Sequence, residues 1–285
     1  MLRRQTFIMI VAAALASSHF IPVIAADPDS GLKFTATFEP IRIFGRPGQV
    51  SVRNFRLTTA KGQRSAFFEA KTEDWLPSED GKQSFYLEPG KVDRSCSRWV
   101  SLNPVESLVL PSEPLEVKIS LSVPPEAEPG GYWCVLTLNE RPDPTQRPQG
   151  VAVRFLTSIS VGIFVYLDPV ERSARIQDVQ IHEDRAEVAV LNTGNSPLGV
   201  EGRVEFLSPD SQEKIAEALI SRRTVVLDPA PRALLSTALP DRDALPTGRY
   251  LVRVILDVGL DAYIGVQRVV EVNRESASQR AALED

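Results

Sequence analysis

Period-two alternation of apolar and polar residues is the feature that most restricts the fold of this chain. In one run, Val117, Ile119, Leu121 and Val123 alternate with Lys118, Ser120 and Ser122, and residues 204–206 and 252–256 follow the same pattern. Helical periodicity is scarce. Pro and Gly interrupt the alternating runs at short intervals, and the chain contains 22 Pro and 16 Gly. Short strands separated by frequent turns predict an all-β fold made of antiparallel sandwiches.

The pattern of strands and turns occurs twice along the chain. Residues 109–135 and 226–252 each hold an alternating strand, a turn with Pro and Gly, and a Tyr that opens the next strand. A Tyr in this place is typical of the tyrosine corner of immunoglobulin-like sandwiches. Further upstream, residues 50–54 and 188–192 are matching strands, each predicted to end in Asn. We therefore expect two tandem immunoglobulin-like β-sandwich domains, joined near Asp168 and Pro169.

The spacing of the two copies differs at one place. The distance from the Asn to the Tyr is 78 residues in the first copy (54 to 132) and 58 in the second (192 to 250). The first domain therefore carries about twenty extra residues, which we place between Trp75 and Arg98.

The beginning of the chain has the layout of a secretory signal peptide. A basic start at residues 1–4 precedes an apolar run at 6–16, and Val23 and Ala25 stand at the −3 and −1 positions of a cleavage site. The alternative is a transmembrane anchor, but the run ends after eleven residues, about half the length that a membrane span needs. The prediction is a signal peptide over 1–26, sandwiches over 27–167 and 170–273, and a polar tail over 274–285. The mature protein is expected to be periplasmic or secreted.

The two cysteines, Cys96 and Cys134, both fall in the first predicted domain. An even number of cysteines in an exported chain favours a disulfide. The bond would close a loop of 39 residues (96 to 134), worth roughly 4 kcal/mol in the chain-entropy model. Two buried free thiols are the alternative. No C-x-x-C motif is present, so a catalytic dithiol is not expected.

The sequence contains few of the residues that catalysis and cofactor binding need. Its two His are His19, inside the signal peptide, and His182, which we expect in a solvated turn at a strand end. No clustered zinc ligands and no Gly-rich phosphate motif occur, and a net charge of −5 gives no footprint for nucleic acid. We expect no catalytic residue, no metal and no cofactor. A glycosidase pair among the carboxylates at 73–80 is the remaining enzymatic alternative.

Residues 151–166 form the most informative segment. Its apolar series on one face is Val151, Val153, Phe155, Ile159, Val161, Ile163 and Val165. A strand of this length spans about 50 Å, longer than a small sandwich requires. Long apolar edge strands are normally covered, so one left open indicates that a partner adds a strand to it by β-augmentation. The alternative is a bent strand that crosses into the second domain with both faces buried.

At this point the chain resembles the periplasmic chaperones of pilus assembly, of the chaperone–usher type. Residues 40–44, Pro-Ile-Arg-Ile-Phe, look like an early motif of that family, and residues 162–169 look like the end of its long last strand in the first domain. The resemblance implies two immunoglobulin-like domains, a carboxylate-binding role for Arg42, and partner-strand binding by Val153, Phe155, Ile159, Val161 and Ile163. The family has a Lys within that strand, and the matching position here is Gly162. Arg42 as a solvated strand residue is the alternative.

The expected function is a non-catalytic periplasmic assembly factor whose partner is a pilin-like or other exported protein, with neither nucleic acid nor a membrane span involved. The alternative is a module that binds the cell surface or wall through the insertion between Trp75 and Arg98, where Trp75, Phe85 and Tyr86 stand among charges.

Overall fold

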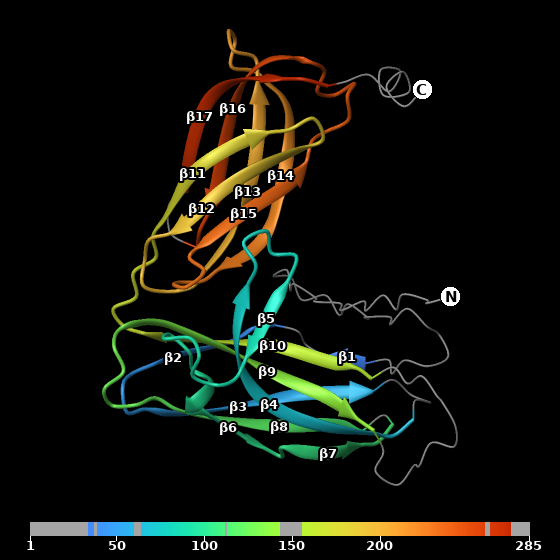
Figure 1. Cartoon of the computed structure of the whole chain (residues 1–285), viewed down its shortest axis with the longest axis vertical. Coiled ribbons are helices and arrows are strands. Elements are labelled where there is room, and N and C mark those ends of the chain that lie inside the picture. The colour runs from blue at the N-terminus through green and yellow to red at the C-terminus, as the bar shows by residue number, and fades with distance from the viewer. Residues whose placement is uncertain are drawn as a thin grey trace, which may run out of the picture.

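The computed structural model describes residues 34–36, 39–59, 64–111, 113–142, 156–259 and 263–274. The signal peptide predicted for residues 1–26 and the tail after Arg274 lie outside the described residues. Within them the regular structure is strand apart from one short 3-10 helix, and it forms two β-sandwiches stacked along the long axis of the molecule (Figure 1). The predicted all-β class and tandem sandwiches are therefore confirmed. In the part that the structure describes, no helix is long and apolar enough to cross a membrane.

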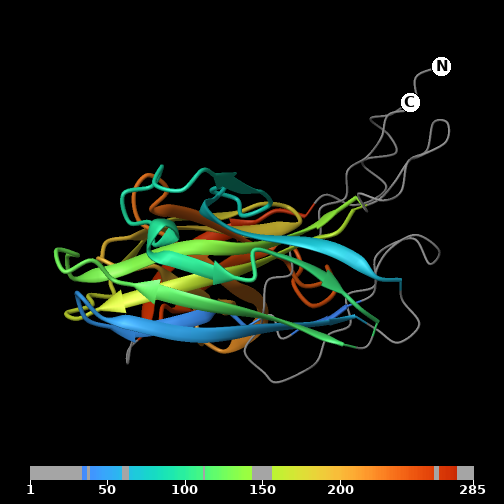
Figure 2. The same ribbon diagram turned by 90° about the horizontal axis from the view of Figure 1, so that it is seen from below.

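The first sandwich pairs a four-stranded sheet with a larger sheet. The four-stranded sheet has the order β1 (Phe34–Ala36), β3 (Val50–Thr59), β8 (Pro114–Ser122) and β6 (Val100–Asn103). The larger sheet has the order β2 (Ile41–Gly45), β10 (Ser158–Leu167), β9 (Gly130–Arg141), β4 (Ala66–Pro77) and β5 (Ser84–Leu87). β7 (Glu106–Val109) also pairs with β4, and a short 3-10 helix covers Ser97–Trp99. Seen from below, the blue β3 and the lime β10 lie in different layers (Figure 2).

The core of the first sandwich follows from the alternation in the sequence. Along β8 every second side chain is buried, and Val117, Ile119 and Leu121 belong to one apolar cluster with Leu57 of the same sheet and Leu136 of the other sheet. Burying a side chain of this size contributes about 1.5–3 kcal/mol. The polar residues between them face solvent, which explains why the strand tolerates Lys118 and Glu116.

The second sandwich is built in the same way. One sheet has the order β11 (Ala174–Ile181), β12 (Arg185–Asn192) and β15 (Arg232–Ala238). The other has the order β14 (Lys214–Val225), β13 (Leu198–Leu207), β16 (Gly248–Asp257) and β17 (Ile264–Val272). Its separate core contains Val188, Val204, Phe206 and Val254.

The internal repeat is visible in two matching tyrosine corners. The hydroxyl of Tyr132 donates to the Glu128 carbonyl at 3.0 Å, and that of Tyr250 donates to the Pro246 carbonyl at 2.8 Å. Both bonds reach back four residues, as the tyrosine-corner prediction requires. β12 ends at Asn192 as expected. β3 does not end at Asn54, because the alternation continues through the buried Phe55 and Leu57.

A third apolar cluster joins the two sandwiches. Its buried members are Val92, Trp133 and Phe164 from the first sandwich and Val226 from the second. The Gly131 amide also donates to the Asn195 carbonyl at 2.7 Å across the junction. β10 ends at Leu167 and β11 begins at Ala174, so the connection contains Asp168 and Pro169. The exact domain boundaries, 27–167 and 170–273, stay a prediction.

Candidate functional site

Strand β10 uses both of its faces inside the molecule. The side chains of Ile159, Val161 and Ile163 are buried in the first core. On the opposite face, Phe164 and Tyr166 point to the cluster between the sandwiches. The sequence left an intramolecular role open for these apolar residues, and the structure places them in intramolecular contacts. Their use by a partner stays a prediction.

The described part of the predicted long strand is shorter than expected. β10 begins at Ser158, and Leu156 and Thr157 precede it without belonging to a strand. Val151, Val153 and Phe155 lie outside the described residues. The buried Glu140 holds the beginning of β10, because its carboxylate accepts the Thr157 amide at 3.1 Å while its own amide donates to the Thr157 carbonyl at 2.8 Å. The side chain of Glu140 thus takes part in closing the pairing between β9 and β10.

β10 is flanked unequally on its two edges. β9 pairs antiparallel with all of Ser158–Leu167, whereas β2 pairs parallel with residues 163–167 only. Among the described residues, no strand pairs with residues 158–162 on the side away from β9. Backbone N–H and C=O groups on such an edge are a template for an added strand.

A cleft of about 300 Å³ lies beside the end of this edge, between the two sandwiches. The first sandwich contributes Arg42 and Phe44 from β2 and Tyr166 from β10, and Arg172 and Arg222 come from the connection and from β14. The rings of Phe44 and Tyr166 stack with centroids 5.1 Å apart, and the Arg172 guanidinium lies 5.3 Å from the Tyr166 centroid. The cleft therefore combines an aromatic wall with three arginines.

The electrostatics of the cleft favour an anion. Burial raises the pKa of Tyr166, although the neighbouring Arg42 and Arg172 act in the opposite direction. The phenol thus stays protonated near neutral pH. Arg222 is neutralised in part by Glu201 at 2.9 Å. Within the described residues, neither Arg42 nor Arg172 forms an ion pair with a carboxylate. Arginine guanidinium groups bind a carboxylate through two parallel hydrogen bonds.

Gly162, which the sequence comparison above singled out, has little free space around it in the structure. Gly162 lies on the same face of β10 as Phe164 and Tyr166, and the Phe164 ring covers it. A Cβ atom at this position would come within 2.9 Å of the Phe164 ring. A larger side chain here would displace a ring that packs between the sandwiches. Arg172 and Arg222 are the other positive residues in the cleft that holds Arg42. The sequence pattern gave no signal for these two arginines, because both lie outside the matching motifs.

The predicted disulfide is present in the structure. It joins Cys96 to Cys134 of β9, with a Cα–Cα distance of 5.3 Å. Both residues are fully buried in the first core. The bond thereby fixes the end of the insertion to the central strand β9.

The same loop is held by the buried carboxylate of Asp74 on β4. It accepts hydrogen bonds from the backbone amides of Lys91 and Val92 at 2.6 and 2.8 Å, and from the hydroxyls of Ser95 and Ser97. Burial alone would raise the pKa of Asp74, but the hydrogen bonds from Ser95, Ser97 and Val92 outweigh it and lower that pKa. Because the carboxylate is fixed by these bonds, Asp74 is a structural residue.

The insertion between Trp75 and Arg98 forms β5 and the loop that follows it. Trp75 packs partly buried in the cluster between the sandwiches, and its carbonyl accepts the indole N–H of Trp133 at 2.7 Å. Phe85 is 49% exposed. The aromatic residues of the insertion are thus divided between an internal contact and the surface.

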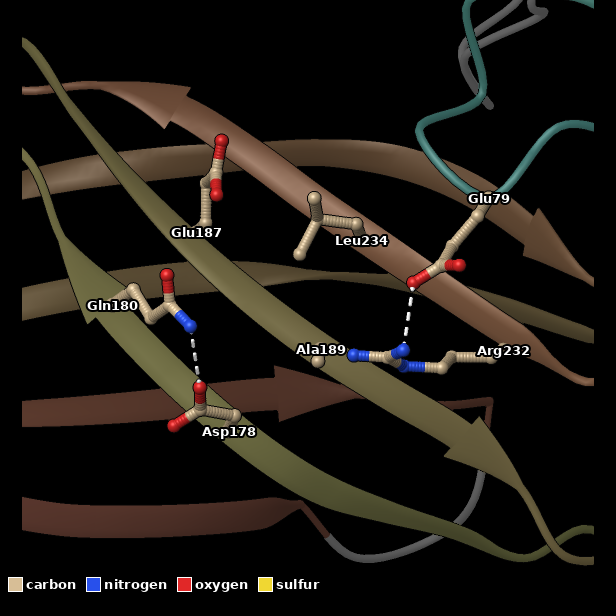
Figure 3. A pocket seen from close by; sticks show the side chains of 7 residues that line it. All are labelled: Glu79, Asp178, Gln180, Glu187, Ala189, Arg232 and Leu234. Carbon is tan, nitrogen blue, oxygen red and sulfur yellow. Dashed lines mark hydrogen bonds and ion pairs between the residues drawn. The ribbon is translucent and has the colours of Figure 1, made fainter.

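A smaller pocket of about 180 Å³ lies where the tip of this insertion meets the second sandwich (Figure 3). Glu79 enters it from the first sandwich and pairs with Arg232 at 3.1 Å, while Asp178 and Glu187 enter from β11 and β12. His182 follows β11 in a turn, as expected, and bonds to Glu187 at 3.0 Å. Among the described residues, no group of His, Cys, Asp and Glu has a geometry that could hold a metal ion.

We expect Ile159→Asp to lower the free energy of unfolding by about 3–5 kcal/mol, because it buries an unpaired charge in the first core. Ser158→Asp is the matched control, since Ser158 is the exposed neighbour on the same strand. Urea unfolding followed by fluorescence measures both variants. Equal stability of Ile159→Asp and the wild type would contradict the placement of Ile159 in the core.

Asp74→Asn tests the hydrogen-bonded carboxylate through its pH dependence. A carboxyl group with a lowered pKa in the folded state adds stability above its unfolded pKa, near 3.8, and loses that contribution as pH falls through the folded pKa. The stability gap between wild type and Asp74→Asn should therefore be constant above about pH 5 and shrink below about pH 4. Chemical unfolding at several pH values measures it, with the exposed Glu126→Gln as control. A gap that does not change between pH 6 and pH 3 would contradict this role.

Comparison with known proteins gives matches at the level of solved structures. No family model and no curated protein matches the chain. One similar structure is the CsuC–CsuE chaperone–tip subunit pre-assembly complex of Csu pili from Acinetobacter baumannii, at 12% identity and a TM-score of 0.45, covering 87% of this chain and 100% of that one. Another is the Salmonella enterica SafA pilin in complex with the SafB chaperone, at 11% identity and a TM-score of 0.43, covering 86% of this chain and 99% of that one. A third is the Pseudomonas aeruginosa CupB2 chaperone, at 14% identity and a TM-score of 0.40, covering 82% of this chain and 99% of that one.

Proposed function

We propose that this protein is a non-catalytic periplasmic assembly factor that holds a strand of an exported partner, as pilus-assembly chaperones do. The observation that carries the proposal is the edge of β10 at residues 158–162, which no described strand pairs and which leads into the arginine-lined cleft. The two features bind different parts of one partner segment, its backbone and its end.

We infer the direction of the partner strand from the position of β2. β2 runs parallel to β10 and begins its pairing at Ile41, opposite Ile163. A partner strand that occupies the preceding stretch of the same edge, also parallel to β10, would therefore end where β2 begins. Its terminal carboxylate would then lie next to Arg42, at the mouth of the cleft.

The arginines supply the anchor for that carboxylate. Arg42 and Arg172 are available to it, and the protonated Tyr166 hydroxyl can donate a further hydrogen bond. A hydrogen bond to a charged group contributes about 1.5–3 kcal/mol, roughly a tenfold to hundredfold change in affinity. Arg42 is the primary anchor because it is the cleft arginine on the strand that the partner would extend.

A surface-binding module is the second candidate, and the exposed Phe85 is the observation that favours it. The insertion that would carry such a surface also makes contacts inside the molecule, through Trp75 and Glu79. We therefore place this function second.

The carboxylate anchor is tested with a captured partner. The tagged protein is used to capture partners from a periplasmic extract, and the last residues of a captured protein are synthesised with a free carboxylate and with a C-terminal amide. We expect the amide to bind the wild type at least about tenfold more weakly. Arg42→Ala should bind the free carboxylate more weakly than the wild type does and should show a smaller difference between the two peptides.

Arg53→Ala is the control, because Arg53 is an exposed arginine on β3 of the same sandwich. It should retain the preference for the free carboxylate. If the wild type binds the two peptides equally, the carboxylate anchor is wrong. If, in addition, the peptide does not displace the captured partner from the protein, the proposal that β10 holds a partner strand is wrong as well.

A further inference from the structure

The tip of the β4–β5 hairpin leaves the first sandwich and contacts the second. β4 and β5 pair from Asp74 with Leu87 to Pro77 with Ser84, and residues 78–83 connect them. In Figure 1 this hairpin rises from the first sandwich to the lower end of the second. The Glu79 carbonyl accepts the amide of Leu234 on β15 at 2.8 Å. The hairpin tip thus pairs with the backbone of a strand in the other sandwich.

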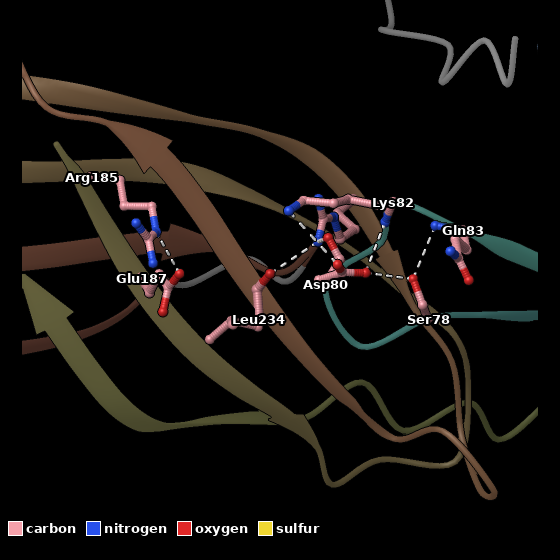
Figure 4. Close-up of polar contacts among 8 residues, drawn as sticks. Ser78, Asp80, Lys82, Gln83, Arg185, Glu187 and Leu234 are labelled. Atoms are coloured by element: carbon pink, nitrogen blue, oxygen red, sulfur yellow. Dashed lines mark hydrogen bonds and ion pairs between the residues drawn. The ribbon is translucent and has the colours of Figure 1, made fainter. Parts of the chain in front are cut away.

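Arg223 bridges the hairpin tip to the second sandwich. Figure 4 shows Ser78 and Asp80 of the tip beside Leu234 of β15. Its guanidinium donates to the Asp80 carbonyl of the tip and, at 2.9 Å, to the Leu234 carbonyl of β15. Arg223 itself belongs to β14, in the opposite sheet of the second sandwich. One side chain therefore links three segments at the place where the edge strands β14 and β15 meet.

The tip has a backbone that fits this contact. Gly81 has a φ of +65°, a backbone conformation that residues other than Gly rarely adopt. A Cβ at Gly81 would lie 2.4 Å from the centre of the Arg223 guanidinium. Within the tip, the Ser78 hydroxyl donates to the Asp80 carboxylate at 2.6 Å, and the Lys82 amide donates to the same oxygen at 3.1 Å. Hydrogen bonds within the tip thus hold its shape in addition to the contact with Arg223.

Two consecutive residues of β14 connect the hairpin tip to the cleft. Arg223 is bound by the hairpin tip, whereas Arg222 lines the cleft with Arg42. The cluster around Trp133 includes Trp75 and Leu87 at the base of the hairpin, and the tip adds a second contact farther out, at Arg223. Two attachments at different places restrict rotation between two bodies more than one does.

We propose that the β4–β5 hairpin is a strut that fixes the angle between the two sandwiches, with Arg223 as its attachment to the second. Relative motion is the default for two domains joined by a small interface. The extra residues of the first domain are, on this proposal, a device that removes that motion and so sets the position of Arg222 in the cleft. The proposal does not depend on what the cleft binds.

Distances between spin labels on the two sandwiches test the strut. Labels are placed at Lys118→Cys on β8 and Val266→Cys on β17, both at exposed positions. The native cysteines are bonded to each other and do not take the label. In one variant Asn-Gly replaces residues 78–83, which joins the directly paired Pro77 and Ser84 by a two-residue turn. In another, Arg223→Met keeps an apolar stem and removes the guanidinium.

Pulsed electron paramagnetic resonance on the labelled wild type should give a narrow distribution of distances between the two labels. In both variants the width of this distribution should increase about twofold. Lys82→Ala is the control, because Lys82 lies on the same tip and its ammonium group pairs with Asp80 of that tip at 3.9 Å. It should keep the wild-type distribution. A distribution as narrow as the wild type in the shortened variant, or in a folded Arg223→Met, would overturn the proposal. The Trp133 cluster and the bond from Gly131 to Asn195 would then fix the angle without the hairpin tip.

Discussion

The side chains of β10 pack in two directions, and the positions of both sandwiches depend on this. Ile159, Val161 and Ile163 fill the first core, while Phe164 on the other face is buried against the second sandwich. Since alternate residues of a strand point to opposite sides, the register of β10 fixes both contacts at once. A shift by one residue would place apolar side chains where polar ones stand.

Apolar burial and backbone hydrogen bonds outweigh exposed charges in holding the two sandwiches together. Trp133 is fully buried and its indole N–H is bonded to the Trp75 carbonyl, so its contact has no unsatisfied polar group. The Glu79–Arg232 pair is half exposed on both sides, and such pairs contribute about 0–1 kcal/mol. The bonds of Arg223 to two carbonyls are partly buried and have a fixed geometry. They decide how the hairpin sits more than the ion pair does.

Much of this fold was predictable because alternation and turn residues act locally. The two tyrosine corners followed from Tyr132 and Tyr250 after their turns, and the disulfide followed from the even number of cysteines in an exported chain. The predicted end of β3 at Asn54 was wrong. The strand continues because Phe55 continues the alternation of apolar and polar residues. Arg172, Arg222 and the hairpin contact of Arg223 could not be predicted. They depend on how two sandwiches sit against each other, and local sequence patterns hold no information about that.

The central claim is that the edge of β10 receives a partner strand whose end reaches Arg42. Hydrogen exchange of the β10 amides, with and without a captured partner, tests it most directly. Amides of β10 that are bonded to β9 should be protected in both states. The account predicts that exchange at residues 158–162 slows when the partner binds, as the edge away from β9 becomes paired. Binding with unchanged exchange at these residues, and new protection elsewhere, would contradict it.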